Sequence, residues 1–167
     1  MKISRRFEKV EREDILRMAE TFLWEPDAQI ARDYLMKTRM LSEDVLRSFR
    51  IGYLPDDLDH QLHGRAIMPL FDASGNLITI TSRIIRDTLP TDELPRYWHE
   101  AYEKSFYLYG VNIAKEYMRK WNFVVLVEGQ FDVLQLHKHG LKNTVAICGT
   151  SLSHIQYATI LRRSEEH

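Results

Sequence analysis

The sequence predicts an α+β lobe of helices and a β-hairpin over residues 1–120, followed by an α/β unit of order βαβα over 121–167. Three patterns support this division. Apolar residues recur at helical spacing through the first fifty residues, whereas after Arg65 they alternate with polar residues. From Phe123 onward, continuous apolar runs alternate with helical patterns, which is typical of parallel strands joined by helices.

Length and composition limit the classes of protein that the chain resembles. Its 167 residues, 44% of them hydrophobic, suffice for one ordinary domain or two small ones. No run of about 18 apolar residues occurs, so no membrane span is expected, and the charged start "MKISRRFEKVERED" is not a secretory signal. The single cysteine, Cys148, indicates a reducing compartment, so a cytoplasmic location is expected. The net charge of −1 requires any nucleic-acid surface to be local.

Three amphipathic helices are expected in the first fifty residues. The first helix, over residues 13–25, ends at Pro26, and Asp27 is the expected N-cap of the second. Ser42 is the expected N-cap of the third helix, whose inward face carries Val45 and Phe49. Because each helix has one apolar stripe, the three helices are expected to pack against one another.

A β-hairpin is expected where "RAIMPLF" and "NLITITSRII" flank the turn sequence "DASG". Alternation assigns one face of the second arm to isoleucines. The opposite face consists of Leu77, Thr79, Thr81 and Arg83, and it is polar enough to meet solvent or a ligand. The loop that follows mixes cations and aromatic rings.

A carboxylate at a strand end marks the candidate site. The apolar strand "FVVLV" runs directly into Glu128 and Gly129, and the next strand ends at Gly149 and Thr150. Ligands of open α/β sheets bind beyond the carboxyl ends of the strands, so these residues are expected at one edge. Glu128 there is suited to hold a divalent cation or to accept a proton, although Glu128 and Asp132 also suit a purely structural role beside a helix N-terminus.

No zinc site is expected. His137 and His139 are the nearest approach to a metal-binding pair, and no cluster of cysteine and histidine has the spacing of a structural zinc site.

The segment "VVLVEGQFDVLQLHKHGLKNTVAICGTSLSHIQ" resembles the first half of the toprim fold of bacterial-type (DnaG-like) primases. The residues that match are Glu128, Gly129, Asp132, Val133, Gly140, Asn143, Gly149, Thr150 and Leu152. Upstream, "ARDYLMKTRMLSEDVLRSFRIGYLPDD", "GRAIMPLFDASGNLITITSRII" and "PRYWHEAYEKSFYLYGVNIA" resemble further blocks of that family, in the same order. The order of four blocks is far more specific than any one of them.

The resemblance implies a DNA primase core that makes short RNA primers by metal-dependent nucleotidyl transfer. Glu128 would be a metal ligand or general base, supported by Asp132, with Mg²⁺ or Mn²⁺ as cofactor. The residues implied in nucleotide and template binding are Arg65, Arg83, Arg96, Tyr97, Lys104, Gly129, Gly149 and Thr150. The implied partners are a single-stranded DNA template, ribonucleoside triphosphates and a replicative helicase.

One departure from the family pattern concerns the basic lobe. The family has two glycines ahead of the arginine matched by Arg83, and this chain has Thr81 and Ser82 there, which alters the expected nucleotide site. Arg39 is a weaker candidate for binding, because it follows the second helix and suits a role in capping that helix.

The family takes its remaining metal-binding acids from an Asp-x-Asp motif on a third toprim strand, and this sequence contains two toprim strands. The toprim fold is therefore expected to be incomplete, and the chain alone is expected to be inactive without a primase C-terminal segment or a second chain. Two alternatives stay open, a toprim nuclease or topoisomerase relative and a non-catalytic module that binds single-stranded DNA.

Overall fold

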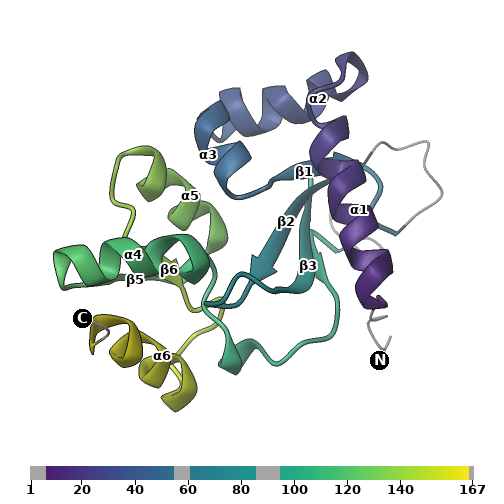
Figure 1. Ribbon diagram of the computed structural model, residues 1–167. Coiled ribbons are helices and arrows are strands. Elements are labelled where there is room, and N and C mark those ends of the chain that lie inside the picture. The colour runs from purple at the N-terminus through teal and green to yellow at the C-terminus, as the bar shows by residue number, and fades with distance from the viewer. Residues whose placement is uncertain (1–6, 55–60, 86–94, 166–167) are drawn as a thin grey trace. The chain divides into compact units, whose positions relative to one another are not determined.

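The computed structural model describes residues 7–54, 61–85 and 95–165, and Figure 1 shows their helices and strands. The described residues fall into two compact units. Unit 1 lies within Met1–Pro69 and Thr79–Ala101, and unit 2 lies within Leu70–Ile78 and Tyr102–His167. Both contain helices and strands, as the expected mixed α and β fold requires.

Unit 1 begins with α1 (Lys9–Phe22), whose buried face includes Leu16 and Ala19. This helix packs on β1 (Gly52–Leu54), a strand that the sequence patterns did not predict. The two backbones meet at Gly52, where an added Cβ would lie 2.5 Å from the carbonyl carbon of Ala19. Glycine at position 52 is therefore required by close approach of helix and strand.

The second predicted helix is built from three different kinds of turn: a 3₁₀ turn (η1, Pro26–Ala28), an α-helix (α2, Gln29–Arg32) and a π-helix (η2, Asp33–Thr38). The predicted cap at Asp27 is wrong, because Asp27 lies inside the 3₁₀ turn and the N-cap of α2 is Ala28. The predicted cap at Ser42 is confirmed, since its Oγ accepts a hydrogen bond of 3.4 Å from the Val45 amide of α3 (Glu43–Ser48).

An antiparallel sheet of order β1-β2-β3-β4 continues from this helical layer. The predicted hairpin is formed by β2 (Arg65–Phe71) and β3 (Leu77–Ile84). Its turn is held by Asp72, whose Oδ1 accepts hydrogen bonds of 2.9 Å from the amides of Ser74 and Asn76. The sequence patterns missed the fourth strand, β4 (Tyr97–His99), which pairs with residues 81–83 of β3.

The face of β3 that was expected to meet solvent or a ligand is largely buried. Thr79 and Thr81 are 1% and 7% exposed, so the expectation is wrong for both. Their hydroxyls are satisfied inside unit 1, where Thr79 donates to Glu100 at 3.3 Å and Thr81 donates to the carbonyl of Met68. A threonine that finds such partners is compatible with a buried face.

Unit 2 contains the parallel pair β5 (Val125–Val127) and β6 (Thr144–Ala146), with α5 (Gln130–Lys138) between them in the chain. Helices α4 (Val111–Trp121) and α6 (His154–Glu165) pack on each other, and a 3₁₀ turn (η3, Lys104–Phe106) precedes α4. The buried core joins Val111, Ala114 and Met118 of α4 to Val145 of β6. Because of this shared core, α4 belongs to unit 2, whereas the sequence-based boundary placed it before residue 121.

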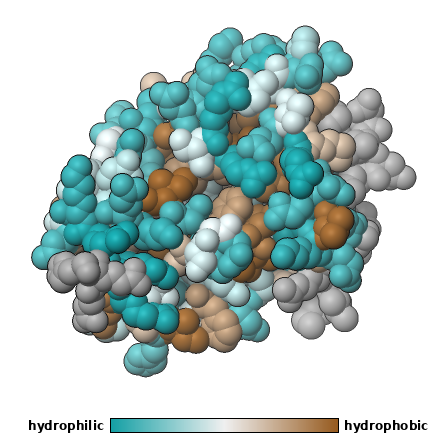
Figure 2. Space-filling model, viewed as in Figure 1, coloured by the Kyte–Doolittle hydropathy of each residue, from teal (hydrophilic) through white to brown (hydrophobic). Residues whose placement is uncertain are grey.

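The expectation that "FVVLV" is covered on both faces is wrong. Phe123 and Leu126 are 53% and 41% exposed. Among the described residues β5 has one partner strand, β6, so its apolar side chains are only partly covered. Figure 2 shows a face on which hydrophilic residues predominate and hydrophobic residues form separate patches.

No helix in the described part of the chain is both long enough and apolar enough to cross a membrane.

Candidate functional site

The main chain fixes Glu128 at the carboxyl edge of the parallel pair in unit 2. The register pairs Val127 with Ala146, and the ladder continues with hydrogen bonds from the amide of Ile147 to the carbonyl of Val127 (3.0 Å) and from that of Cys148 to Glu128 (3.1 Å). The Glu128 side chain is exposed. An acid is therefore held at the position where open α/β sheets bind ligands.

Gly129 and Asp132 belong to the start of α5. Gly129 is the N-cap of the helix, and an added Cβ there would lie 3.1 Å from Oδ2 of Asp132. The exposed carboxylate of Asp132 thus folds back over the first turn, where it stabilises the positive end of the helix dipole. The geometry suits this structural role and also leaves the carboxylate open to solvent, near the strand that ends at Glu128.

Gly149 and Thr150 follow β6 at the same edge and are exposed. The residue in the left-handed region is the preceding one, Cys148, with φ of 52°. Burial raises the pKa of the Cys148 thiol to about 11, so the thiol stays protonated at neutral pH. An added Cβ on Gly149 would meet nothing closer than 3.9 Å, so this glycine leaves open space beside the edge.

Lys104 is brought to this edge by Gln156. The buried amide of Gln156 donates from Nε2 to the carbonyls of Tyr107 (2.8 Å), Ile147 (3.2 Å) and Lys104 (3.3 Å). The positive charge of Lys104 partly opposes the rise in the pKa of the Cys148 thiol. The main chain of Lys104 therefore lies close to Ile147, the residue that follows β6.

Arg83 of unit 1 lies between two tyrosine rings. Its guanidinium carbon is 5.2 Å from the ring centroid of Tyr34 and 5.7 Å from that of Tyr97, its cross-strand partner. Nη1 of Arg83 donates to the carbonyl of Ile84 at 2.8 Å, and its buried Nε has no hydrogen-bond partner among the described residues. A buried donor of this kind is suited to an acceptor from outside the chain, such as a phosphate oxygen.

Arg65 and Arg96 differ in exposure. Arg65 is 2% exposed, and its guanidinium donates to the carbonyls of Pro95 (2.5 Å) and Arg96 (3.4 Å). Burial lowers the pKa of Arg65 from its ordinary value. In this position Arg65 holds the backbone before β4, whereas the Arg96 side chain is exposed.

Sequence reasoning missed Tyr34 and ranked Arg39 as a weaker candidate for binding. Nε of Arg39 donates to the Tyr34 hydroxyl at 2.8 Å, and the Arg39 guanidinium carbon lies 5.6 Å from the Tyr34 ring centroid. No periodic pattern marks Tyr34, because its contact with Arg83 joins segments that lie far apart in the sequence.

The carboxylates at the sheet edge supply only some of the oxygen ligands that a hard divalent cation needs. In residues 7–54, 61–85 and 95–165, no three His, Cys, Asp or Glu side chains gather closely enough to hold a metal ion. Mg²⁺ commonly uses one or two carboxylates together with water and substrate phosphates, and Glu128 with Asp132 matches that donor set. His137, considered for zinc, instead contacts the carbonyl of Thr144 at 2.9 Å through Nε2.

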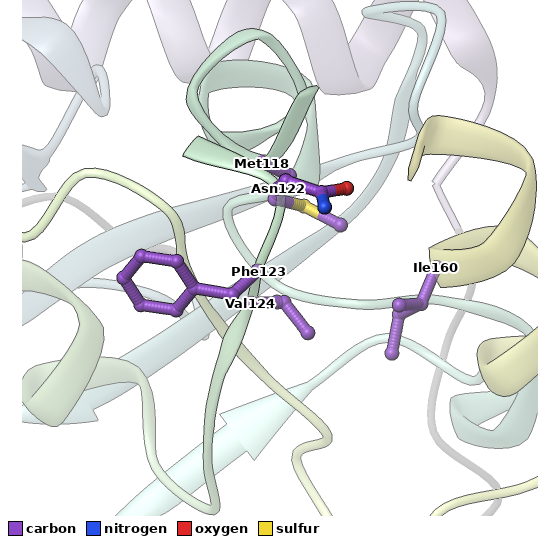
Figure 3. Close-up of a pocket in the computed structure, with 5 residues that line it drawn as sticks. All are labelled: Met118, Asn122, Phe123, Val124 and Ile160. Atoms are coloured by element: carbon purple, nitrogen blue, oxygen red, sulfur yellow. The ribbon is translucent and has the colours of Figure 1, made fainter. Parts of the chain in front are cut away.

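An apolar pocket of about 220 Å³ lies elsewhere in unit 2 (Figure 3). Its lining residues are Met118, Asn122, Phe123, Val124 and Ile160. Because Phe123 and Val124 precede β5 and Glu128 follows it, this pocket lies at the opposite end of the strand from the carboxylate. It is therefore not part of the candidate site.

Comparison with known proteins identifies the family. Residues 122–167 match the Toprim domain. A DNA primase of Synechocystis sp. is 30% identical over 180 aligned positions, which cover 86% of this chain, and a DNA primase of Aquifex aeolicus is 35% identical over 155, which cover 75%. The chain belongs to the DnaG-like DNA primases.

The RNA polymerase domain of Mycobacterium tuberculosis primase DnaG shares the fold of this primase chain. That domain, solved with a double-stranded DNA oligomer carrying a 6-nucleotide overhang, matches with a TM-score of 0.80 at 21% identity, covering 93% of this chain and 58% of that one. The primase chain spans 28% and 31% of the length of the two curated relatives.

Proposed function

We propose that this chain is part of a primase core that synthesises RNA primers on a DNA template. The observation that supports this most directly is the sheet edge of unit 2, where Glu128, Gly149 and Thr150 follow two paired strands within a match to the Toprim domain. The proposed substrates are ribonucleoside triphosphates and single-stranded DNA, and the proposed location is the cytoplasm, with a replicative helicase as a partner.

The proposed reaction is nucleotidyl transfer, in which a ribose 3′-oxygen attacks the α-phosphate of the next triphosphate and pyrophosphate leaves. Mg²⁺ or Mn²⁺, when bound, would supply positive charge to the phosphate oxygens. Glu128 would hold that ion or accept the hydroxyl proton, and Lys104 would attract the triphosphate. Because Glu128 and Asp132 supply at most two carboxylates, further ligands would come from an additional primase segment, from water or from the substrate.

Unit 1 would bind the nucleic acid. In this proposal Arg83 and Arg96 contact phosphates, Tyr97 stacks on a base or ribose, and Arg65 holds the backbone that carries Arg96 and Tyr97. Stacking on an aromatic ring is worth about 1–3 kcal/mol per base. The half-exposed ring of Tyr97 is available for such stacking.

The test is template-dependent primer synthesis with Mg²⁺ or Mn²⁺, using this chain together with a primase segment that carries an Asp-x-Asp motif. Glu128→Gln should lower the rate by about 10²–10⁴-fold, the range expected for loss of a general base. Glu116→Gln, which removes an exposed acid from α4 of the same unit, is the matched control and should be neutral. Full activity of Glu128→Gln would contradict the role of Glu128.

A non-catalytic DNA-binding role is the second candidate, because the described residues gather no three metal-binding side chains. It predicts salt-dependent binding of single-stranded DNA that falls when Arg83, Arg96 and Lys104 are neutralised and does not change with Glu128→Gln. Strand cleavage without use of ribonucleotides would instead identify a nuclease or topoisomerase.

A further inference from the structure

Four side chains of unit 1 alternate between ring and guanidinium. In order they are Tyr97, Arg83, Tyr34 and Arg39, here called the tyrosine–arginine stack. Each guanidinium carbon lies 5.2–5.7 Å from the centroid of a neighbouring ring, so each pair is within the range of cation–π attraction. Tyr34 is central, because both arginines lie against its ring.

The π-helix brings Arg39 back to Tyr34. The amide of Arg39 donates to the carbonyl of Tyr34 at 2.9 Å, which is the i to i+5 bond of a π turn. In a regular α-helix the amide of residue 38 would bond to the Tyr34 carbonyl. Thr38, and not Arg39, would then occupy the place beside Tyr34. Single π turns inside helices frequently occur at functional sites.

The stack brings two positive charges to one ring. Their mutual repulsion is unfavourable unless an anion lies nearby. Asp33, the acid at the start of the π-helix, pairs with Lys37 at 3.1 Å, and no ion pair between described residues includes Arg83. A phosphate would supply a negative charge beside Arg83 and an acceptor for its Nε.

We propose that Tyr34, through the π turn, is a positioning residue that holds Arg39 and Arg83 as a pair of guanidinium groups for one phosphate. This deepens the proposed function, on which it rests, by assigning roles to Tyr34 and Arg39. The phosphate belongs to a DNA strand or to a free nucleotide, and Tyr97 at the end of the stack offers a ring for the adjoining base.

The experiment measures fluorescence anisotropy of a labelled single-stranded DNA oligonucleotide with the full chain, over a range of salt concentrations. Tyr34→Leu removes the ring and should raise Kd by about three- to tenfold, because two cation–π contacts are lost. The slope of log Kd against log salt should fall by about 0.7, the value for one phosphate contact on a single strand. Tyr34→Phe keeps the ring and should retain most of the affinity and the full slope.

Three further measurements keep the test decisive. Tyr157→Leu, which removes a half-exposed tyrosine from α6, is the control and should leave both Kd and slope unchanged. Arg39→Gln removes one of the two guanidinium groups and should reproduce the effect of Tyr34→Leu, which covers the case in which Tyr34→Leu does not fold. Competition by unlabelled ribonucleoside triphosphate that is lost in Arg39→Gln assigns the phosphate to a nucleotide, and its absence assigns it to the strand.

Wild-type affinity and slope in Tyr34→Leu or Arg39→Gln would overturn the proposal, as would a wild-type chain that binds neither oligonucleotide nor nucleotide. The binding assay needs no polymerisation. A chain that makes no primers even together with the Asp-x-Asp segment, but shows the Tyr34 dependence, therefore refutes the proposed function in catalysis and leaves the phosphate site standing.

Discussion

The carboxylate of Glu100 and the guanidinium of Arg12 form a buried, two-pronged ion pair. Nε and Nη2 of Arg12 donate to the two carboxylate oxygens at 2.8 and 2.7 Å. The same carboxylate accepts hydrogen bonds of 2.7 Å from the amides of Phe7 and Ile80. One side chain therefore joins the N-terminal helix, β3 and the residue after β4.

Removal of the Glu100 charge should strongly destabilise unit 1. Glu100→Gln leaves the Arg12 charge buried without its partner, and breaking a buried pair in this way costs about 3–5 kcal/mol. Denaturant unfolding gives the free energy directly. The control is Asp14→Asn on the same helix, where the exposed pair with Arg17 should be worth less than about 1 kcal/mol. Equal effects of the two substitutions would show that burial does not govern the Glu100 interaction.

Gly52→Ala should destabilise the contact between α1 and β1. The new methyl group would lie 2.5 Å from the carbonyl carbon and 2.7 Å from the Cβ of Ala19, and forcing extra atoms into packed backbone typically costs about 1–3 kcal/mol. Thermal unfolding of the variant measures the loss. Gly149→Ala, where the nearest atom is 3.9 Å away, is the control and should change the melting temperature little. An unchanged melting temperature in Gly52→Ala would contradict the packing described here.

His137 should make stability depend on pH. Burial, together with the nearby charge of Lys142, lowers the pKa of this histidine below its ordinary value of 6.5, and the hydrogen bond to Thr144 opposes the shift only in part. Protons therefore bind more readily to the unfolded chain, so the free energy of unfolding should fall as pH drops below about 6.5, by at most about 1.4 kcal/mol per pH unit. In His137→Gln this decline should be smaller, and an identical decline would assign it to other groups.

Gln156→Leu should weaken the site through Lys104 rather than through Glu128. The substitution leaves the carbonyls of Lys104, Tyr107 and Ile147 without the amide that joins them, and unsatisfied buried groups cost about 1–3 kcal/mol each. Both the unfolding free energy and the affinity for triphosphate should decrease. The control is Gln135→Leu, which replaces a glutamine of α5 in the same unit by the same residue. Loss of stability without loss of triphosphate affinity would argue against a role for Lys104.

Features specified by neighbouring residues could be predicted from the sequence. Ser42 was expected to cap the third helix, and its Oγ accepts a 3.4 Å hydrogen bond from the amide of Val45. The hairpin turn at Asp72 is likewise local. The three-residue strands β1 and β4 were missed, because their pairing depends on residues distant in sequence. The burial of Thr79 was missed for the same reason, since its partner Glu100 lies 21 residues away.

The candidate site divides in the same way. A strand that ends in Glu128 and Gly129 is a local pattern, so the sheet edge could be predicted. The role of Tyr34 could not be predicted, because Arg83 reaches its ring from a strand far along the chain and Arg39 reaches it through a π turn. Side-chain stacking between distant elements leaves no periodic pattern in the sequence.

The hydrogen bond that fixes Glu128 joins main-chain atoms, so no side chain at position 148 is needed to make it. Lineages descended from a common ancestor can therefore exchange most side chains around this edge while the acid keeps its place, provided that proline does not arise at position 148. Inheritance of the backbone ladder, more than of the neighbouring residues, is what would let distant homologues retain the same chemistry.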